Sequence, residues 1–184
     1  MNWNYTPYSK TNNKHKVFIS YYHKDDSYYR ERFESLFGHL FINTSVKPGD
    51  IDTDDSDEYI KRLIQEGYIS GASIIVVLIG AKTYCRKHVD WEISAALNKK
   101  VGGYSGLVGL LLPTHPDYDR NEYHTSLVPD RLQDNIKSGY AVFKDWSYDE
   151  NDIKKWVEKA FQARIGNADK IDNSREQFKY NRCE

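Results

Sequence analysis

The sequence predicts an α/β domain built on a doubly wound, mainly parallel five-stranded sheet with helices on both faces. Short β-branched and aromatic runs alternate along the chain with segments of helical periodicity. One run, residues 73–79, is apolar without alternation, which is typical of a parallel strand covered on both sides. The length of 184 residues suits one such domain. We place it at residues 16–165, between a polar N-terminal extension (1–15) and a polar, loosely held C-terminal tail (166–184).

The first strand and helix follow from composition and spacing. Residues 16–20 are β-branched and aromatic, and Asp25, Asp26 and Ser27 offer side chains that commonly start helices. The apolar positions expected on the inner face of this helix are Tyr29, Phe33, Leu36, Phe37 and Leu40.

The next elements lead to the middle of the sheet. Residues 41–46 predict a second strand, and the acidic segment 50–58 precedes a second helix that starts at Ser56 or Asp57. The apolar face of that helix comprises Ile60, Leu63, Ile64 and Tyr68. Residues 73–79 then form the central strand.

The second half continues the alternation. A loop at 80–87 leads to a third helix at 89–97, and a fourth strand at 107–112 stops at Pro113. Residues 113–130 are polar and punctuated by proline, so we expect a long surface loop there, followed by a short fifth strand at 140–143. The last helix is expected to direct Ile153, Trp156, Val157, Ala160 and Phe161 inward.

Charge and cysteine content exclude several classes of function. The formal net charge is −1, which predicts no attraction to nucleic acid or to an anionic membrane. The longest apolar run is far below the ~20 residues that cross a bilayer. Cys85 and Cys183 lack metal-type spacing and the first sixteen residues lack an apolar signal-peptide core, so we expect a reducing cytosol.

Three segments are expected to meet at one rim of the sheet. Residues 20–23, 47–57 and 80–92 each follow the carboxyl end of a strand, where such sheets bind ligands. Glu92 stands beside Trp91 at the opening of the third helix. The acidic run 50–58 lacks the spacing of a calcium loop, and we predict no metal. No G-x-G-x-x-G loop follows the first strand, and no aspartate follows the third, which argues against a dinucleotide oxidoreductase and a phosphoacceptor domain.

The amino-acid sequences of these segments resemble those of TIR domains. The segment 17–21 (VFISY) with its acidic helix start looks like the opening of that family, and residues 74–79 followed by Trp91-Glu92 look like its third strand and glutamate-bearing helix. Over roughly residues 16–112, and especially 56–58 and 86–92 (RKHVDWE), the chain is most similar to the TIR-like proteins of the bacterial Thoeris antiphage system.

The resemblance implies a flavodoxin-like TIR fold and cleavage of NAD between nicotinamide and ribose, with Glu92 as the catalytic residue. NAD is then the substrate and no cofactor is needed. The product in some members is a cyclic ADP-ribose-type signal that activates a partner effector, and we expect a phage-derived activator and a homo-oligomer. The chemistry suits one carboxylate, because nicotinamide leaves as a neutral molecule and an anion facing the oxocarbenium-like carbon supplies the stabilisation. The residues predicted to contact substrate are Phe18, Ser20, Tyr21, Asp50, Tyr84, His88 and Trp91.

Simpler interpretations stand beside these. Glu92 could complement the helix dipole, Trp91 could be a packing residue, and His88 could be an exposed polar side chain. Ser20 could cap a loop while Tyr21 packs. His88 also departs from many TIR hydrolases, which place a tryptophan four residues before the glutamate. The alternative function is a TIR-like adaptor that binds other proteins without turning over NAD.

Overall fold

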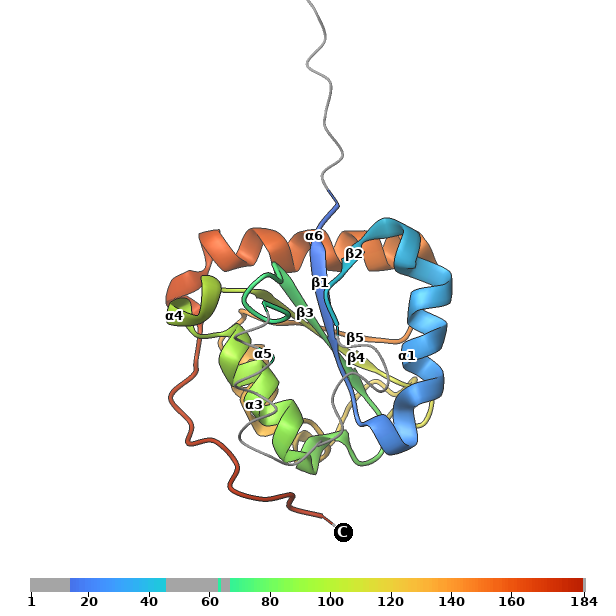
Figure 1. Cartoon of the computed structure of the whole chain (residues 1–184). Coiled ribbons are helices and arrows are strands. Elements are labelled where there is room, and N and C mark those ends of the chain that lie inside the picture. Colours follow the sequence, from blue (N-terminus) through green and yellow to red (C-terminus); the bar gives the residue numbers. More distant parts are fainter. Residues whose placement is uncertain (1–13, 46–62, 64–66, 184) are drawn as a thin grey trace, which may run out of the picture.

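The structure, a computed structural model, describes residues 14–45, 63 and 67–183. Its sheet has five parallel strands, as predicted, and their order is β2-β1-β3-β4-β5 (Figure 1). The strands are β1 (Lys16–Ser20), β2 (Ile42–Asn43), β3 (Ile74–Ile79), β4 (Gly106–Leu111) and β5 (Val142–Asp145). The predicted α/β fold is therefore confirmed, although β2 is shorter than the 41–46 expected.

The central position of β3 follows from its composition. All six of its residues are buried, and it pairs with β1 on one side and with β4 on the other. A strand that is covered on both faces has no solvated side for a polar residue to occupy, so its sequence does not alternate.

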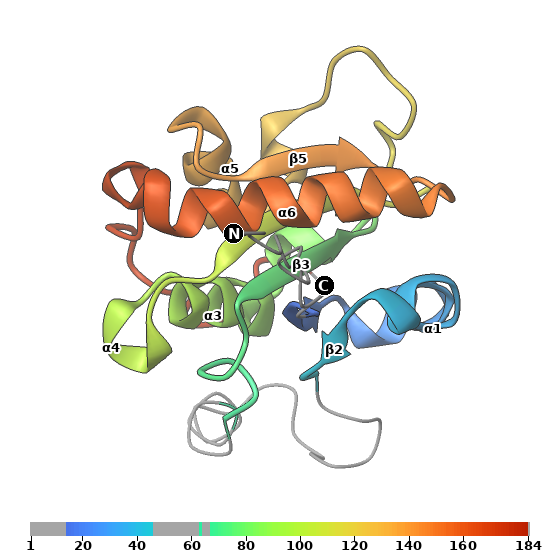
Figure 2. The ribbon, with the colours of Figure 1, turned by 90° about the horizontal axis from the view of Figure 1, so that it is seen from above.

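Helices cover the two faces of the sheet and enclose two hydrophobic cores (Figure 2). Along β1 the side chains alternate between them, with Phe18 in one core and Val17 and Ile19 in the other, as the two-residue period of a strand requires. The Phe18 core packs under α3 (Lys87–Ala96) and α5 (Asp130–Lys137). The other core packs under α1 (His23–Phe37) and α6 (Glu150–Gly166).

Helix α1 begins earlier than its sequence suggested. Its N-cap is Tyr22, which provides no side-chain hydrogen bond, and Asp25 and Asp26 lie inside the first turn. The predicted capping role of the acidic pair is therefore wrong. Phe33 and Phe37 are buried as predicted, while Tyr29, Leu36 and Leu40 pack at the edge of the core. The predicted cap of the second helix at Ser56 or Asp57 lies outside the described residues.

The second half of the chain contains two short helices that the sequence did not predict. They are α4 (Lys99–Gly102) and α5, the second of which follows the long loop and a 3₁₀ turn at Thr125–Leu127. Helix α6 buries Ile153, Val157 and Ala160 as predicted. None of the described helices combines the length and apolar character needed to cross a membrane.

Candidate functional site

Glu92 lies in the middle of α3, on the face that carries His88 one helical turn earlier. The side chain of Glu92 is buried, with 2% of its residue surface exposed, and His88 is 3% exposed. The His88 Nε2 lies 3.0 Å from the Tyr21 carbonyl oxygen, at the carboxyl end of β1. The interpretation of His88 as an exposed polar residue is therefore wrong, because its imidazole ties α3 to the loop after β1.

Aromatic and basic side chains from the loop after β1 and the start of α3 pack together at this rim. The rings of Tyr21 and His23 stack with centroids 4.4 Å apart, and the rings of His23 and His88 lie 5.6 Å apart. The Arg86 guanidinium lies 3.7 Å over the Tyr22 ring. Arg86 is buried, and within the described part of the chain its Nε has no hydrogen-bond partner. Arg86 was not among the site residues predicted from the sequence.

A buried carboxyl joins the loop after β3 to α1. The Thr83 hydroxyl donates to Asp26 Oδ2 at 2.9 Å and accepts the Gly80 N–H at 2.9 Å. Gly80 permits this approach, because a Cβ there would lie 2.0 Å from Asp26 Oδ1. Burial raises the pKa of Asp26 from 3.8 to about 6, against the opposing hydrogen bond from Thr83. From the sequence, Asp26 was interpreted as a residue that starts a helix. Its contact with Thr83 was not predicted, because 57 positions separate the two residues.

The other residues predicted to contact substrate, as far as the structure describes them, lie in different places: in the core, at the end of β1, in the loop after β3 or against the C-terminal tail. Phe18 is enclosed in the core beneath α3, Ser20 is buried at the end of β1, and Tyr84 is half-buried in the loop after β3. The Trp91 Nε1–H donates to the Phe178 carbonyl oxygen at 2.8 Å, so its indole is engaged by the C-terminal tail. Asp50 lies outside the described residues.

The C-terminal tail is not loosely held, in contrast to our expectation. Phe178 is buried, and its backbone N–H donates to Asp90 Oδ2 at 2.9 Å. The same carboxylate accepts from Arg131 Nε at 2.9 Å, in an ion pair that is almost fully buried. Arg131 belongs to α5, which the sequence argument missed, so this network was not predicted.

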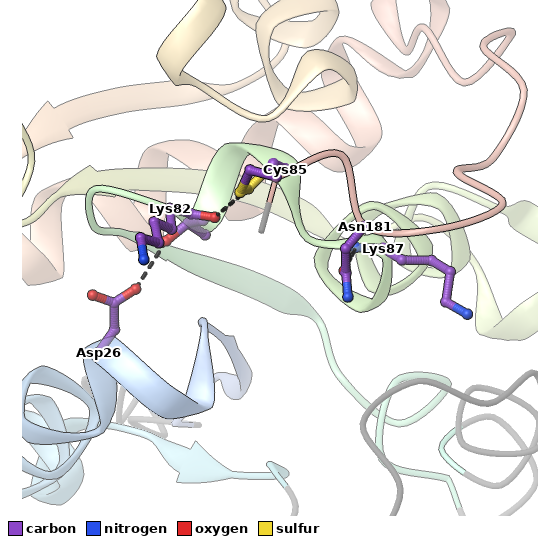
Figure 3. The surroundings of a disulfide bond; sticks show 7 residues. Asp26, Lys82, Cys85, Lys87 and Asn181 are labelled. Carbon is purple, nitrogen blue, oxygen red and sulfur yellow. Dashed lines mark hydrogen bonds between the residues drawn. A yellow bond between two sulfur atoms is a disulfide. The ribbon is translucent and has the colours of Figure 1, made fainter.

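The two cysteines form a disulfide. Cys85, just before α3, is joined to Cys183 near the end of the chain, with their Cα atoms 5.6 Å apart (Figure 3). The cysteine spacing had led us to expect a reducing environment, and nothing local in the sequence indicated the pairing. Two residues that are 98 positions apart meet only because the tail folds back across α3.

Within the described ranges, no group of three or more His, Cys, Asp or Glu side chains could hold a metal ion. The described residues contribute a buried carboxylate, an imidazole, a guanidinium and aromatic rings from α3 and the loop after β1.

Comparison with known proteins gives one family. Residues 18–117 match the family model described as the Thoeris protein ThsB, TIR-like domain, close to the range over which we noted the resemblance. Among solved structures, the chain is similar to the TIR domains of the activated Roq1 resistosome that directly recognises the pathogen effector XopQ. The identity is 13% with a TM-score of 0.41, over 88% of this chain and 93% of that one. None of the curated proteins matches the sequence.

Proposed function

This chain belongs to the Thoeris ThsB TIR-like domain family, and we propose from that premise that it is an antiphage-defence enzyme that cleaves the nicotinamide–ribose bond of NAD. The observation that carries the proposal is the burial of the Glu92 carboxylate in α3, one helical turn after His88. A glutamate placed only to complement a helix dipole would be expected near the solvent, in the first turn, whereas Glu92 is the sixth residue of the helix and 2% exposed.

The proposed reaction requires only one carboxylate. The bond between the ribose C1′ and the pyridinium nitrogen breaks, and its electron pair returns to the ring, so nicotinamide leaves neutral. The Glu92 carboxylate stabilises the positive charge that develops on the sugar carbon, and does so strongly because it is shielded from water. Water then adds to C1′ and releases a proton, which gives ADP-ribose.

Cyclisation is the second fate of the same intermediate. A nucleophilic atom of the ADP-ribose itself adds to C1′ in place of water, with loss of one proton, which requires a folded ligand in a site that excludes water. We propose that this product is the signal that activates a partner effector. The buried Arg86 guanidinium suits the pyrophosphate of the dinucleotide, because arginine binds phosphate oxygens with paired N–H groups.

The test is incubation of the purified protein with NAD, alone and with candidate phage components, followed by mass spectrometry of nicotinamide and ADP-ribose species. We expect Glu92→Gln and Glu92→Ala to remove nicotinamide release while the melting temperature stays close to that of the wild type. Glu122→Gln, at an exposed loop position, is the matched control and should retain full activity. Full activity in either Glu92 variant would exclude the mechanism. If the wild type released no nicotinamide with any activator, the protein-binding adaptor would replace the enzyme.

A further inference from the structure

The C-terminal strap, defined as residues 167–183, runs along α3 and α5 (Figure 1) and contacts α3 between Lys87 and Ser94. Four positions of α3 make these contacts, and their spacing places them on one stripe of the helix. They are Lys87, Asp90, Trp91 and Ser94. His88 and Glu92 belong to the neighbouring stripe, one residue further along. The strap therefore holds the side of α3 next to the one that carries the proposed catalytic carboxylate.

The strap completes the buried ion pair between α3 and α5. Arg131 donates through Nη1 to Asn173 Oδ1 at 2.7 Å and through Nη2 to the Arg175 carbonyl oxygen at 2.8 Å, in addition to its bonds with Asp90. Asp90 in turn accepts the Phe178 N–H. Buried charges are costly unless their hydrogen-bonding capacity is filled, and the strap fills the part of this capacity that the two side chains leave open to each other.

The end of the strap also caps α3. The N-cap residue, Arg86, offers no side-chain hydrogen bond, and the Lys87 N–H instead donates to Asn181 Oδ1 at 2.9 Å. The Arg182 N–H donates to the Cys85 carbonyl oxygen at 2.9 Å. A cap that normally comes from the adjoining residue is here supplied from 94 positions away.

The disulfide anchors this cap. Figure 3 shows Asn181 beside Lys87 at the start of α3, with Cys85 in the preceding loop and Asp26 across the same loop. Cys85 is fully buried, whereas Cys183 is half-buried, so Cys183 is the more exposed of the two disulfide-bonded residues. The Lys82 carbonyl oxygen lies 3.0 Å from Cys85 Sγ and would accept the hydrogen bond of a Cys85 thiol after reduction.

We propose that the C-terminal strap is a positioning element for Glu92, with Asp90 and Asn181 as positioning residues and the Cys85–Cys183 disulfide as a redox latch. The role assigned to Glu92 rests on the proposed NAD cleavage. Release of the latch uses a dithiol: one thiolate attacks the Cys183 sulfur, the S–S bond breaks, and its electron pair leaves on the Cys85 sulfur, which takes a proton. The second thiol of the reductant displaces Cys183, giving two cysteine thiols and the cyclic disulfide of the reductant.

The experiment compares oxidised protein with protein reduced by dithiothreitol, using the full chain. Reduction should lower kcat for NAD by about 3- to 100-fold, the range expected from a small misplacement of a catalytic group, with a smaller change in KM. Cys183→Ser should match the reduced wild type and no longer respond to dithiothreitol. Asn181→Ala should lower kcat in the oxidised state, and Asn181→Asp, which keeps the capping oxygen, should restore it. Glu176→Gln, at an exposed position of the strap, is the matched control.

A second measurement separates this proposal from the enzymatic one. Amide hydrogen exchange in the first turn of α3 should be faster in reduced protein, in Cys183→Ser and in Asn181→Ala than in oxidised wild type or Glu176→Gln. If no form released nicotinamide, the enzymatic proposal would have failed, and exchange would still decide whether the strap fixes α3. Unchanged exchange in all three perturbed forms, or an unchanged kcat in an active enzyme, would overturn the strap proposal.

Discussion

Replacing Asp26 with asparagine is expected to stabilise the protein at neutral pH. The carboxyl is fully buried, and of its two oxygens only Oδ2 has a hydrogen-bond partner within the described residues, the Thr83 hydroxyl. An ionised carboxylate in that setting costs free energy that an amide does not, because burial disfavours the charge. The amide introduced by Asp26→Asn would keep an oxygen able to accept from Thr83. The substitution therefore removes the charge with little change in shape.

The magnitude follows from the pKa. A native-state pKa of about 6, against 3.8 for the free group, corresponds to about 3 kcal/mol. Because the native pKa is raised, the native state binds more protons between these values. The contribution of Asp26 to stability is thus fully present below pH 3.8 and is lost as the pH rises through about 6. The advantage of Asp26→Asn should grow over that window and level off above about pH 7.

The assay is urea unfolding of both proteins from about pH 4.5 to about pH 8, without reductant. Comparing the pH dependence removes the constant difference between an amide and a carboxylic acid. Glu31→Gln, at an exposed position on the same helix, is the control and should show no growth in stability over this range. A difference between wild type and Asp26→Asn that does not change with pH would refute the assignment of a buried, raised-pKa carboxyl.

Two further substitutions test the packing. Arg131→Met should destabilise the protein by about 3–5 kcal/mol in urea unfolding, because it leaves Asp90 charged and buried. Adding Asp90→Leu should recover stability, and a loss below about 1 kcal/mol in the single variant would contradict the buried pair. Gly106→Ala should cost about 1–3 kcal/mol or more, since a Cβ there would lie 2.2 Å from the Ala160 carbonyl oxygen of α6. Gly38→Ala, where a Cβ meets nothing within 4 Å, is its control, and equal stabilities of the two alanine variants would exclude this close approach.

The local pattern of apolar residues was sufficient to predict most of the strands and helices. Strands β1, β3 and β4 and helices α3 and α6 were predicted close to their observed positions, because each shows an apolar period of its own element type. Helix α5 was missed for the same reason. Its buried residues include Arg131, Gln133 and Asn135, so its inner face is largely polar and gives no apolar period.

Some residues of the candidate site could likewise be predicted from the sequence, whereas their long-range contacts could not. Glu92 and the aromatic residues after β1 could be proposed from the sequence because they follow the carboxyl ends of strands and carry a family resemblance. The contacts of Asp26 with Thr83, of Asp90 with Arg131 and of Cys85 with Cys183 could not, since 57, 41 and 98 positions separate the partners.

The sequence by itself thus determined the parallel sheet, its buried centre and the helix that presents Glu92. Only the tertiary structure decided that the polar tail would bind α3, supply its cap and close a disulfide before it. The physical reason is that hydrophobic period is a property of neighbouring residues, whereas the partner of a buried polar group is chosen by whichever distant segment the fold brings within hydrogen-bond reach.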